Sequence, residues 1–191
     1  MKNNKPVFIS VDGHGGSGKS TFAQKLAHQL GAQVIHIDDF TGQDAADDWY
    51  KSLLTNVIEP ALAGAVTLSY SRAKWWPEHH PDPVVNQPVT PIMIIEGVCS
   101  SRNELREYLS LKVFVDTPRA ICIERGLARD RGMGGKSDAE IVALWKQWLI
   151  WDDQYFAKDN PQAAADLQVD GTRPFDEAYE IIKLKLAPMT K

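Results

Sequence analysis

The chain has 191 residues, of which 43% are hydrophobic and 24% are charged, and its formal net charge is −4. These values are typical of a globular protein long enough for one domain with a substantial core. No run of Lys and Arg exceeds two residues, so we expect no nucleic-acid partner. No apolar run approaches the roughly 20 residues that span a bilayer, so we expect no contact with a membrane.

The amino-terminal residues lack the apolar region of a signal peptide. The two cysteines, Cys99 and Cys122, form no C-x-x-C pair and have apolar neighbours, which is typical of reduced core thiols. No spacing of His, Cys and Asp indicates zinc. We therefore expect a cytoplasmic protein.

Residues 13–21 fit the P-loop pattern G-x-x-x-x-G-K-[ST]. The apolar run at 7–11 predicts a buried parallel strand, and the spacing over 22–30 predicts a helix. Between them, glycine-rich backbone can surround a polyphosphate with N–H groups beside the positive end of the helix. Lys19 would reach the β- and γ-phosphates and Ser20 would ligate Mg²⁺, while His14 would space the glycines and face solvent or the acceptor. The nucleotide-binding residues predicted in this loop are Gly13, His14, Gly15, Gly16, Ser17, Gly18, Lys19, Ser20 and Thr21.

Two further strands are predicted to end in carboxylates. The run at 33–37 delivers Asp38, Asp39 and Phe40, and the run at 91–95 ends at Glu96. The carboxyl ends of parallel strands share one edge of the sheet, so these groups should lie near Lys19. Asp38 and Glu96 suit an enzyme that holds Mg²⁺ and accepts a proton from a hydroxyl. A solvated strand end for the aspartates and a structural role for Glu96 stay open, and His36 is expected to be a packed or surface residue.

The segment between these strands begins with a predicted helix over about 47–58, which Glu59-Pro60 should break or kink. Residues 64–90 are rich in proline, include Trp75 and Trp76, and are predicted to form an irregular loop. Long ordered loops in compact domains are commonly functional, so this one is expected to bind either an acceptor or a partner protein.

A short helix is predicted at 101–109, with Ser101 and Glu104 in capping-box spacing. A fourth strand at 111–115 follows, and then a helix with Thr117 as its cap and Pro118 in its first position. This helix carries Arg125 and Arg129 on one face, and a glycine-rich loop extends from it to about residue 137. The arginines and loop suit a small lid that closes over ATP, although ordinary helix-face pairing with Glu124 or Asp130 stays open.

A second capping box, formed by Ser137 and Glu140, predicts a long helix to about residue 158. Its aromatic residues recur every three or four positions and are predicted to pack in the core: Trp145, Trp148, Trp151 and Tyr155. A last strand at 167–170 and a helix at 175–186 complete the pattern. The alternation predicts a single α/β domain over 1–191: a three-layer P-loop NTPase fold whose five-stranded, mostly parallel sheet has helices on both faces.

These motifs together resemble the uridine kinase-like P-loop kinases, a family that includes uridine–cytidine and nicotinamide riboside kinases. The resemblance rests on the P-loop, on 37–40, on Asp48-Trp49 followed by 59–62, on 94–98 and on 125–132. It implies that Asp38 is the catalytic base, that Glu96 binds acceptor or orders metal, and that Arg125 and Arg129 grip the phosphates. It also implies a turn near adenine at 170–172. The acceptor pocket would lie within about 39–90, with these candidate contacts: Asp38, Asp39, Phe40, Tyr70, Trp75, Trp76 and Glu96.

The sequence leaves two functions open. The first is a kinase that uses ATP and Mg²⁺ to phosphorylate a hydroxyl of a nucleoside-like or other small polar molecule, as a monomer or a homodimer. Thr41 stands where uridine kinases usually carry an aromatic residue, so the acceptor is unassigned. The second is a regulatory or adaptor protein that binds a nucleotide and has no small-molecule acceptor.

Overall fold

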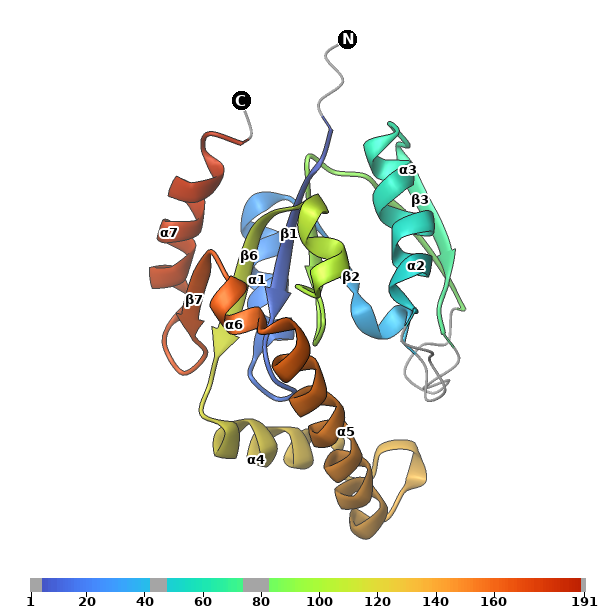
Figure 1. Ribbon diagram of the computed structural model, residues 1–191, viewed down its shortest axis with the longest axis vertical. Coiled ribbons are helices and arrows are strands. Elements are labelled where there is room, and N and C mark those ends of the chain that lie inside the picture. The colour runs from blue at the N-terminus through green and yellow to red at the C-terminus, as the bar shows by residue number, and fades with distance from the viewer. Residues whose placement is uncertain (1–4, 42–47, 74–82, 190–191) are drawn as a thin grey trace.

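The computed structural model describes residues 5–41, 48–73 and 83–189. A five-stranded sheet at the centre has the order β2-β5-β1-β6-β7, and every neighbouring pair is parallel (Figure 1). The strands are β1 (Val7–Asp12), β2 (Gln33–His36), β5 (Ile92–Glu96), β6 (Leu109–Asp116) and β7 (Leu167–Asp170). This confirms the predicted α/β fold, and it brings the carboxyl ends of all five strands to one edge of the sheet.

Each face of the sheet has its own hydrophobic core because successive strand residues point to opposite faces. Ile9 and Ile94 pack under α1 (Lys19–Leu30) and α7 (Phe175–Leu186). Phe8 and Ile95 point the other way, into a core that also contains Leu68 and these helical residues: Leu53, Val57, Ile58 and Ala61. No helix among the described residues is long and apolar enough to cross a membrane.

The helix predicted over about 47–58 begins at Tyr50, continues to Leu62 and is not broken at Pro60. It consists of α2 (Tyr50–Leu53), a π-helical turn (Leu54–Ile58) and α3 (Glu59–Leu62) in direct succession. Pro60 is the second residue of α3, which directly follows the π turn. The wider π turn before it provides the adjustment that the sequence pattern could not reveal.

The prediction of an irregular loop over 64–90 was wrong for its described part. Strands β3 (Thr67–Ser71) and β4 (Val84–Pro88) form an antiparallel hairpin, with Leu68 paired to Gln87 and Tyr70 to Val85. The strand signal was present, because buried Leu68 and Tyr70 alternate with exposed polar residues. Trp75 and Trp76 lie outside the described residues.

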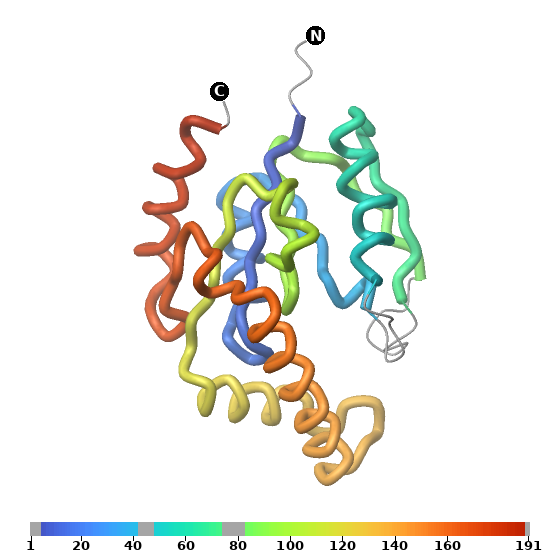
Figure 2. The backbone as a smooth tube through the Cα atoms, viewed as in Figure 1, coloured from blue at the N-terminus to red at the C-terminus, as the bar shows by residue number. Residues whose placement is uncertain are grey.

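Helices α4 (Arg119–Asp130) and α5 (Asp138–Asp159) project from the strand-end edge, joined by a loop at their far end (Figures 1 and 2). The capping box of α5 is confirmed, since Ser137 and Glu140 each accept a hydrogen bond from the other's backbone N–H. The predicted packing of the aromatic stripe holds for Trp145 and Tyr155, which are buried, but Trp151 is 45% exposed. A short helix, α6 (Pro161–Ala164), leads to β7.

Two predicted helix caps were wrong because their side chains are used elsewhere. The segment after β5 forms a 3-10 helix at Asn103–Tyr108 without a side-chain cap, and the Ser101 hydroxyl bonds the Ser10 hydroxyl at 2.9 Å. Thr117 does not cap α4 but donates its hydroxyl to the Ser17 carbonyl at 2.9 Å. That contact ties the end of β6 to the P-loop.

Candidate active site

The P-loop connects β1 to α1 and packs against α4 and α5. Gly16 has φ 81°, and a methyl group added to it would lie 2.0 Å from the Cys122 carbonyl of α4, so a side chain cannot be accommodated. Lys19 is buried and donates to the His14 carbonyl at 3.4 Å, which folds its ammonium group back over the loop.

The prediction that His14 faces solvent or an acceptor was wrong. Its imidazole stacks on Phe156 of α5, with ring centroids 4.1 Å apart and planes 8° from parallel. Its Nδ1 atom lies 3.4 Å from an Asp152 carboxylate oxygen of the same helix. His14 therefore anchors the phosphate loop to α5, a contact that spacing along the chain could not reveal.

Glu96 connects the P-loop to the end of β2. Its buried carboxylate accepts a hydrogen bond from the Ser20 hydroxyl at 2.8 Å, and its other oxygen lies 2.8 Å from His36 Nδ1. Burial by itself would raise the pKa of Glu96, but the contact with His36 and the charge of Lys19 outweigh burial and lower it. The hydrogen bond to Glu96 in turn raises the pKa of His36. His36 is partly exposed, as expected, and it also belongs to the strand-end cluster, which its place two residues before Asp38 could have indicated.

Asp38 lies at the same edge, in a 3-10 turn (Ile37–Asp39) that directly follows β2. Its side chain reaches solvent, yet the surrounding protein disfavours its charge and raises its pKa, and the nearby negative charge of Glu96 adds to this effect. Lys19, His36 and Arg129 act in the opposite direction. The structure thus gathers the predicted base, the Glu96 carboxylate and the P-loop lysine within electrostatic reach of one another.

Three predicted acceptor contacts lie in the interior of the protein. The buried Asp39 carboxylate accepts from Arg72 Nε at 2.8 Å and from the Tyr70 hydroxyl at 3.2 Å, which ties the hairpin to β2. Phe40 and Tyr70 are both buried, with their ring centroids 4.8 Å apart. Their part in acceptor binding stays a prediction.

The two lid arginines lie on α4 and have different partners. Arg125 is exposed and donates to the Gly171 carbonyl at 3.5 Å, in the turn after β7. Arg129 forms two hydrogen bonds with the carboxylate of Asp130, at 2.6 and 2.9 Å. The alternative of pairing with Asp130 is therefore observed for Arg129, and gripping of phosphates by either arginine stays a prediction.

A cavity of about 460 Å³ opens beside the P-loop, between α1, β7 and α7. Gly18 and Thr21 line it on the P-loop side, Arg125 lines it on the lid side, and Asp170, Gly171 and Phe175 line it opposite. Its size and its position at the amino-terminal end of α1 suit a nucleoside joined to phosphates in the P-loop. This is also where the resemblance placed the adenine of ATP.

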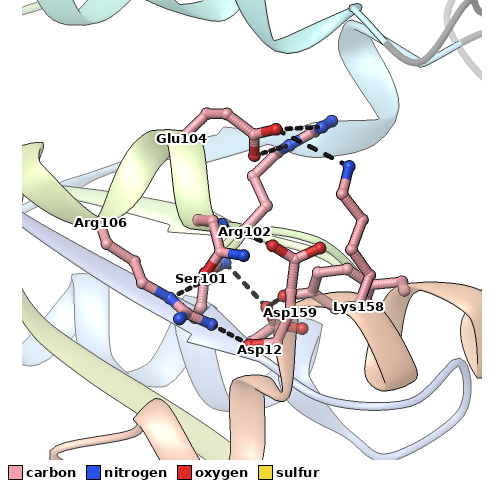
Figure 3. A network of polar contacts seen from close by, with 9 residues as sticks. Asp12, Ser101, Arg102, Glu104, Arg106, Lys158 and Asp159 are labelled. Atoms are coloured by element: carbon pink, nitrogen blue, oxygen red, sulfur yellow. Dashed lines mark hydrogen bonds and ion pairs between the residues drawn. The ribbon is translucent and has the colours of Figure 1, made fainter.

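A buried polar network around Asp12, at the end of β1, supports the P-loop, and the sequence interpretation missed it. Asp12 is fully buried and accepts from the Gly13 N–H, the Ser101 N–H and the Tyr155 hydroxyl. Figure 3 shows how the network continues from Ser101: Arg106 donates to the Ser101 carbonyl and to the Asp159 carbonyl. The carboxylate of Asp159 accepts from the Asn103 N–H. The only sequence clue was a carboxylate at the end of a strand, as at Asp38 and Glu96.

The oxygen donors at this edge fit Mg²⁺. Ser20 supplies a hydroxyl, and Glu96 and Asp38 supply two carboxylates close enough for one to shift the pKa of the other. Mg²⁺ prefers such hard oxygen ligands and takes the rest from phosphates and water. Within 5–41, 48–73 and 83–189, no three His, Cys, Asp or Glu side chains gather to hold a metal by themselves.

Sequence comparison identifies relatives of this chain. The model of the phosphoribulokinase/uridine kinase family matches residues 66–173. A uridine kinase from Limosilactobacillus reuteri is 29% identical over 162 residues, which cover 76% of this chain and 74% of the relative. A uridine kinase from Clostridium perfringens is 27% identical over 156 residues, covering 72% and 74%.

Comparison with solved structures agrees on the fold. A possible uridine kinase from Bacillus stearothermophilus superposes with a TM-score of 0.56 at 18% identity, covering 89% of this chain and 91% of that one. Shikimate kinase from Bacteroides thetaiotaomicron gives a TM-score of 0.53 at 15% identity, covering 95% and 98%. The arrangement of sheet and helices is thus shared with P-loop kinases.

Proposed function

The chain belongs to the phosphoribulokinase/uridine kinase family and is a P-loop small-molecule kinase, and from this premise we propose that it transfers the γ-phosphoryl group of ATP to a hydroxyl. The acceptor in this proposal is a nucleoside-like or other small polar metabolite. The observation that carries it is the Ser20–Glu96 hydrogen bond, which joins the P-loop to the strand-end carboxylates with Asp38 beside them. A protein that only bound a nucleotide would have no use for a proton acceptor there.

In the proposed reaction Asp38 takes the proton of the acceptor hydroxyl as the oxygen attacks phosphorus. Its raised pKa favours this role, because a base is most effective when its pKa approaches the working pH. Lys19 and Arg129 provide positive charge for the transferring phosphoryl oxygens. When bound, Mg²⁺ would neutralise phosphate charge, with Ser20, Asp38 and Glu96 as the residues that hold it directly or through water.

The proposal divides the chain into a nucleotide side and an acceptor side. The cavity by Arg125 and Gly171 would take the nucleoside of ATP, and residues 125–137 would close over the phosphates. The acceptor would enter between the strand ends and the segment 39–90, which includes the hairpin. A cytoplasmic location and the absence of nucleic-acid and membrane partners belong to the same proposal, and a homodimer is compatible with it.

The test is ADP release from Mg-ATP across a panel of nucleosides, ribosides, sugars, pantothenate-like compounds and nucleoside monophosphates, with Lys19→Ala as the blank. We expect one acceptor class to raise the rate at least tenfold, and Asp38→Asn to lower kcat by roughly a hundredfold while ATP affinity is retained. Asp116→Asn is the matched control, because this exposed carboxylate also ends a strand of the sheet. Normal turnover by Asp38→Asn would contradict the assigned base.

The alternative, a nucleotide-dependent adaptor, makes the opposite prediction for the same panel. ATP would bind, every acceptor would leave the rate unchanged, and hydrolysis would be slow. That result would shift the search to a protein partner, with the segment around residues 75–80 as bait.

A further inference from the structure

The carboxylate of Asp130 is in an unusual position for a helix. It belongs to the last residue of α4, is only 3% exposed, and binds the side chain of its immediate neighbour, Arg129. Adjacent helical residues point about 100° apart and do not normally face each other, so the guanidinium has to fold around the helix end to reach it. A negative charge at the carboxyl end of a helix also opposes the helix dipole. The pair is therefore not explained as an ordinary stabilising contact on a helix surface.

A third group holds this carboxylate from the neighbouring helix. Trp145 of α5 donates its indole N–H to an Asp130 oxygen at 2.9 Å, and the indole is itself buried. The ring lies against Gly126 of α4, where an added methyl group would come within 2.0 Å of it. A methyl group at Gly15 of the P-loop would lie 3.4 Å from the same ring. One indole thus touches the phosphate loop and fixes the Asp130 carboxylate.

Arg129 is exposed and its guanidinium lies near the acidic groups at the strand ends. Its side chain is 62% exposed, and the charges of both Asp38 and Glu96 contribute to the raised pKa of its guanidinium, after the larger contribution of Asp130. The guanidinium is therefore within electrostatic reach of the strand-end carboxylates. Asp130 contacts Nε and Nη2, which leaves the N–H groups on Nη1 available for another anion.

We propose that Asp130, itself held by the Trp145 indole, is a positioning residue that presents the Arg129 guanidinium to the phosphates of the bound nucleotide. Asp130 acts through Arg129 and touches no substrate. Trp145 makes the orientation depend on the seating of α5 against the P-loop, so the loop that binds phosphate and the arginine that contacts it are aligned by one side chain. This inference rests on the proposed function, which places phosphates at the P-loop.

The test is a double-mutant cycle on the dissociation constant of Mg-ATP, measured by isothermal titration calorimetry on the full chain. Arg129→Ala and Asp130→Asn are each expected to weaken binding about tenfold, as for loss of a charge-assisted hydrogen bond. If Asp130 acts through Arg129, the double variant is no weaker than Arg129→Ala alone. Asp153→Asn is the matched control, because this exposed aspartate pairs with Arg119 at 2.7 Å across the same two helices, and its affinity should equal wild type.

Two results would overturn the positioning role: an unchanged affinity in Asp130→Asn, or additive losses that reach about a hundredfold in the double variant. A purely structural effect of Asp130→Asn would appear as such additivity. Trp145→Phe removes the indole N–H together with the five-membered ring of the indole, and it carries the test if Asp130→Asn does not fold. It should weaken binding in the wild-type background and have no effect in Arg129→Ala.

The outcomes separate this inference from the proposed function. Wild-type protein that binds Mg-ATP and phosphorylates an acceptor, but shows an additive cycle, contradicts only the positioning role. Wild-type protein that binds Mg-ATP without phosphorylating any acceptor, but shows a non-additive cycle, contradicts only the kinase proposal.

Discussion

Removing the hydroxyl of Tyr155 tests the buried network under the P-loop. Asp12 is completely buried and accepts three hydrogen bonds, from the Gly13 N–H at 2.7 Å, the Ser101 N–H at 2.8 Å and the Tyr155 hydroxyl at 2.7 Å. The two backbone donors cannot be removed without a proline that would distort the chain, but Tyr155→Phe removes the third donor and keeps the ring. The variant leaves a buried carboxylate with one donor fewer.

The expected loss is set by the charge on the acceptor. A hydrogen bond to a charged group contributes about 1.5–3 kcal/mol, and for a chain of this length each kcal/mol corresponds to about 2–4 °C in Tm. A loss of about 2 kcal/mol therefore predicts that Tyr155→Phe lowers Tm by roughly 4–8 °C at a pH where Asp12 is ionised. Since Tyr155 lies on α5 and Asp12 adjoins the P-loop, weaker Mg-ATP binding should accompany this loss.

The loss should also depend on pH, with a sign that follows from the pKa of Asp12. Burial raises this pKa above 3.8, so stability falls as pH rises from 3.8 through the folded-state value. Tyr155→Phe removes a contact that lowers the pKa, which raises the folded-state value further. The difference between variant and wild type should therefore be small while Asp12 is protonated in both folded proteins, and it should grow as pH rises through the folded-state pKa of the wild type.

Thermal unfolding followed by circular dichroism at several pH values measures both effects. Tyr179→Phe on α7 is the control, because no hydrogen bond of its hydroxyl is found among the described residues and its ring contacts Lys183 instead. A Tm for Tyr155→Phe within about 1 °C of the control would refute the reasoning. So would a difference that does not change with pH.

Three further predictions concern other parts of the fold. Gly126→Ala places a methyl group 2.0 Å from the Trp145 ring and should cost about 1–3 kcal/mol in urea unfolding, while an unchanged midpoint would mean the helices separate freely. Asp39→Ala removes the buried carboxylate that accepts from Arg72 Nε and from the Tyr70 hydroxyl and should cost about 3 kcal/mol, with hydrogen exchange rising first in the hairpin; uniform exchange would contradict this. The hydrogen bond with Arg102 lowers the pKa of Glu104 to about 2. The stability that this pair contributes is therefore present above pH 4.5 and is lost as pH falls toward 2. Glu104→Gln should therefore have a lower Tm than wild type at pH 7 and a similar Tm near pH 2, and a constant difference would be evidence against the ion pair.

The sequence by itself determined the parts of this protein that depend on local patterns. The P-loop, the five strands of the sheet and the helix that follows Ser137 are each specified within about 20 residues, through turn glycines, apolar periodicity and capping. Parallel α/β topology then required Lys19, Asp38 and Glu96 to meet at one edge, since strand ends in such a sheet share a side. The hairpin was missed although buried Leu68 and Tyr70 alternate with polar neighbours, because prolines nearby obscured the pattern.

Only the tertiary structure decided which partner each polar side chain has. His36 pairs with Glu96 across two strands, and the Tyr155 hydroxyl reaches Asp12 from a helix 143 residues away in sequence. The indole of Trp145 bonds Asp130 because α4 and α5 lie side by side, which no spacing within either helix reveals. The physical reason is that a hydrogen bond requires its atoms to lie within about 3 Å in the right orientation, whereas apolar burial tolerates many neighbours. A sequence pattern can therefore predict that a residue is buried, while its hydrogen-bond partner is fixed by how distant segments pack.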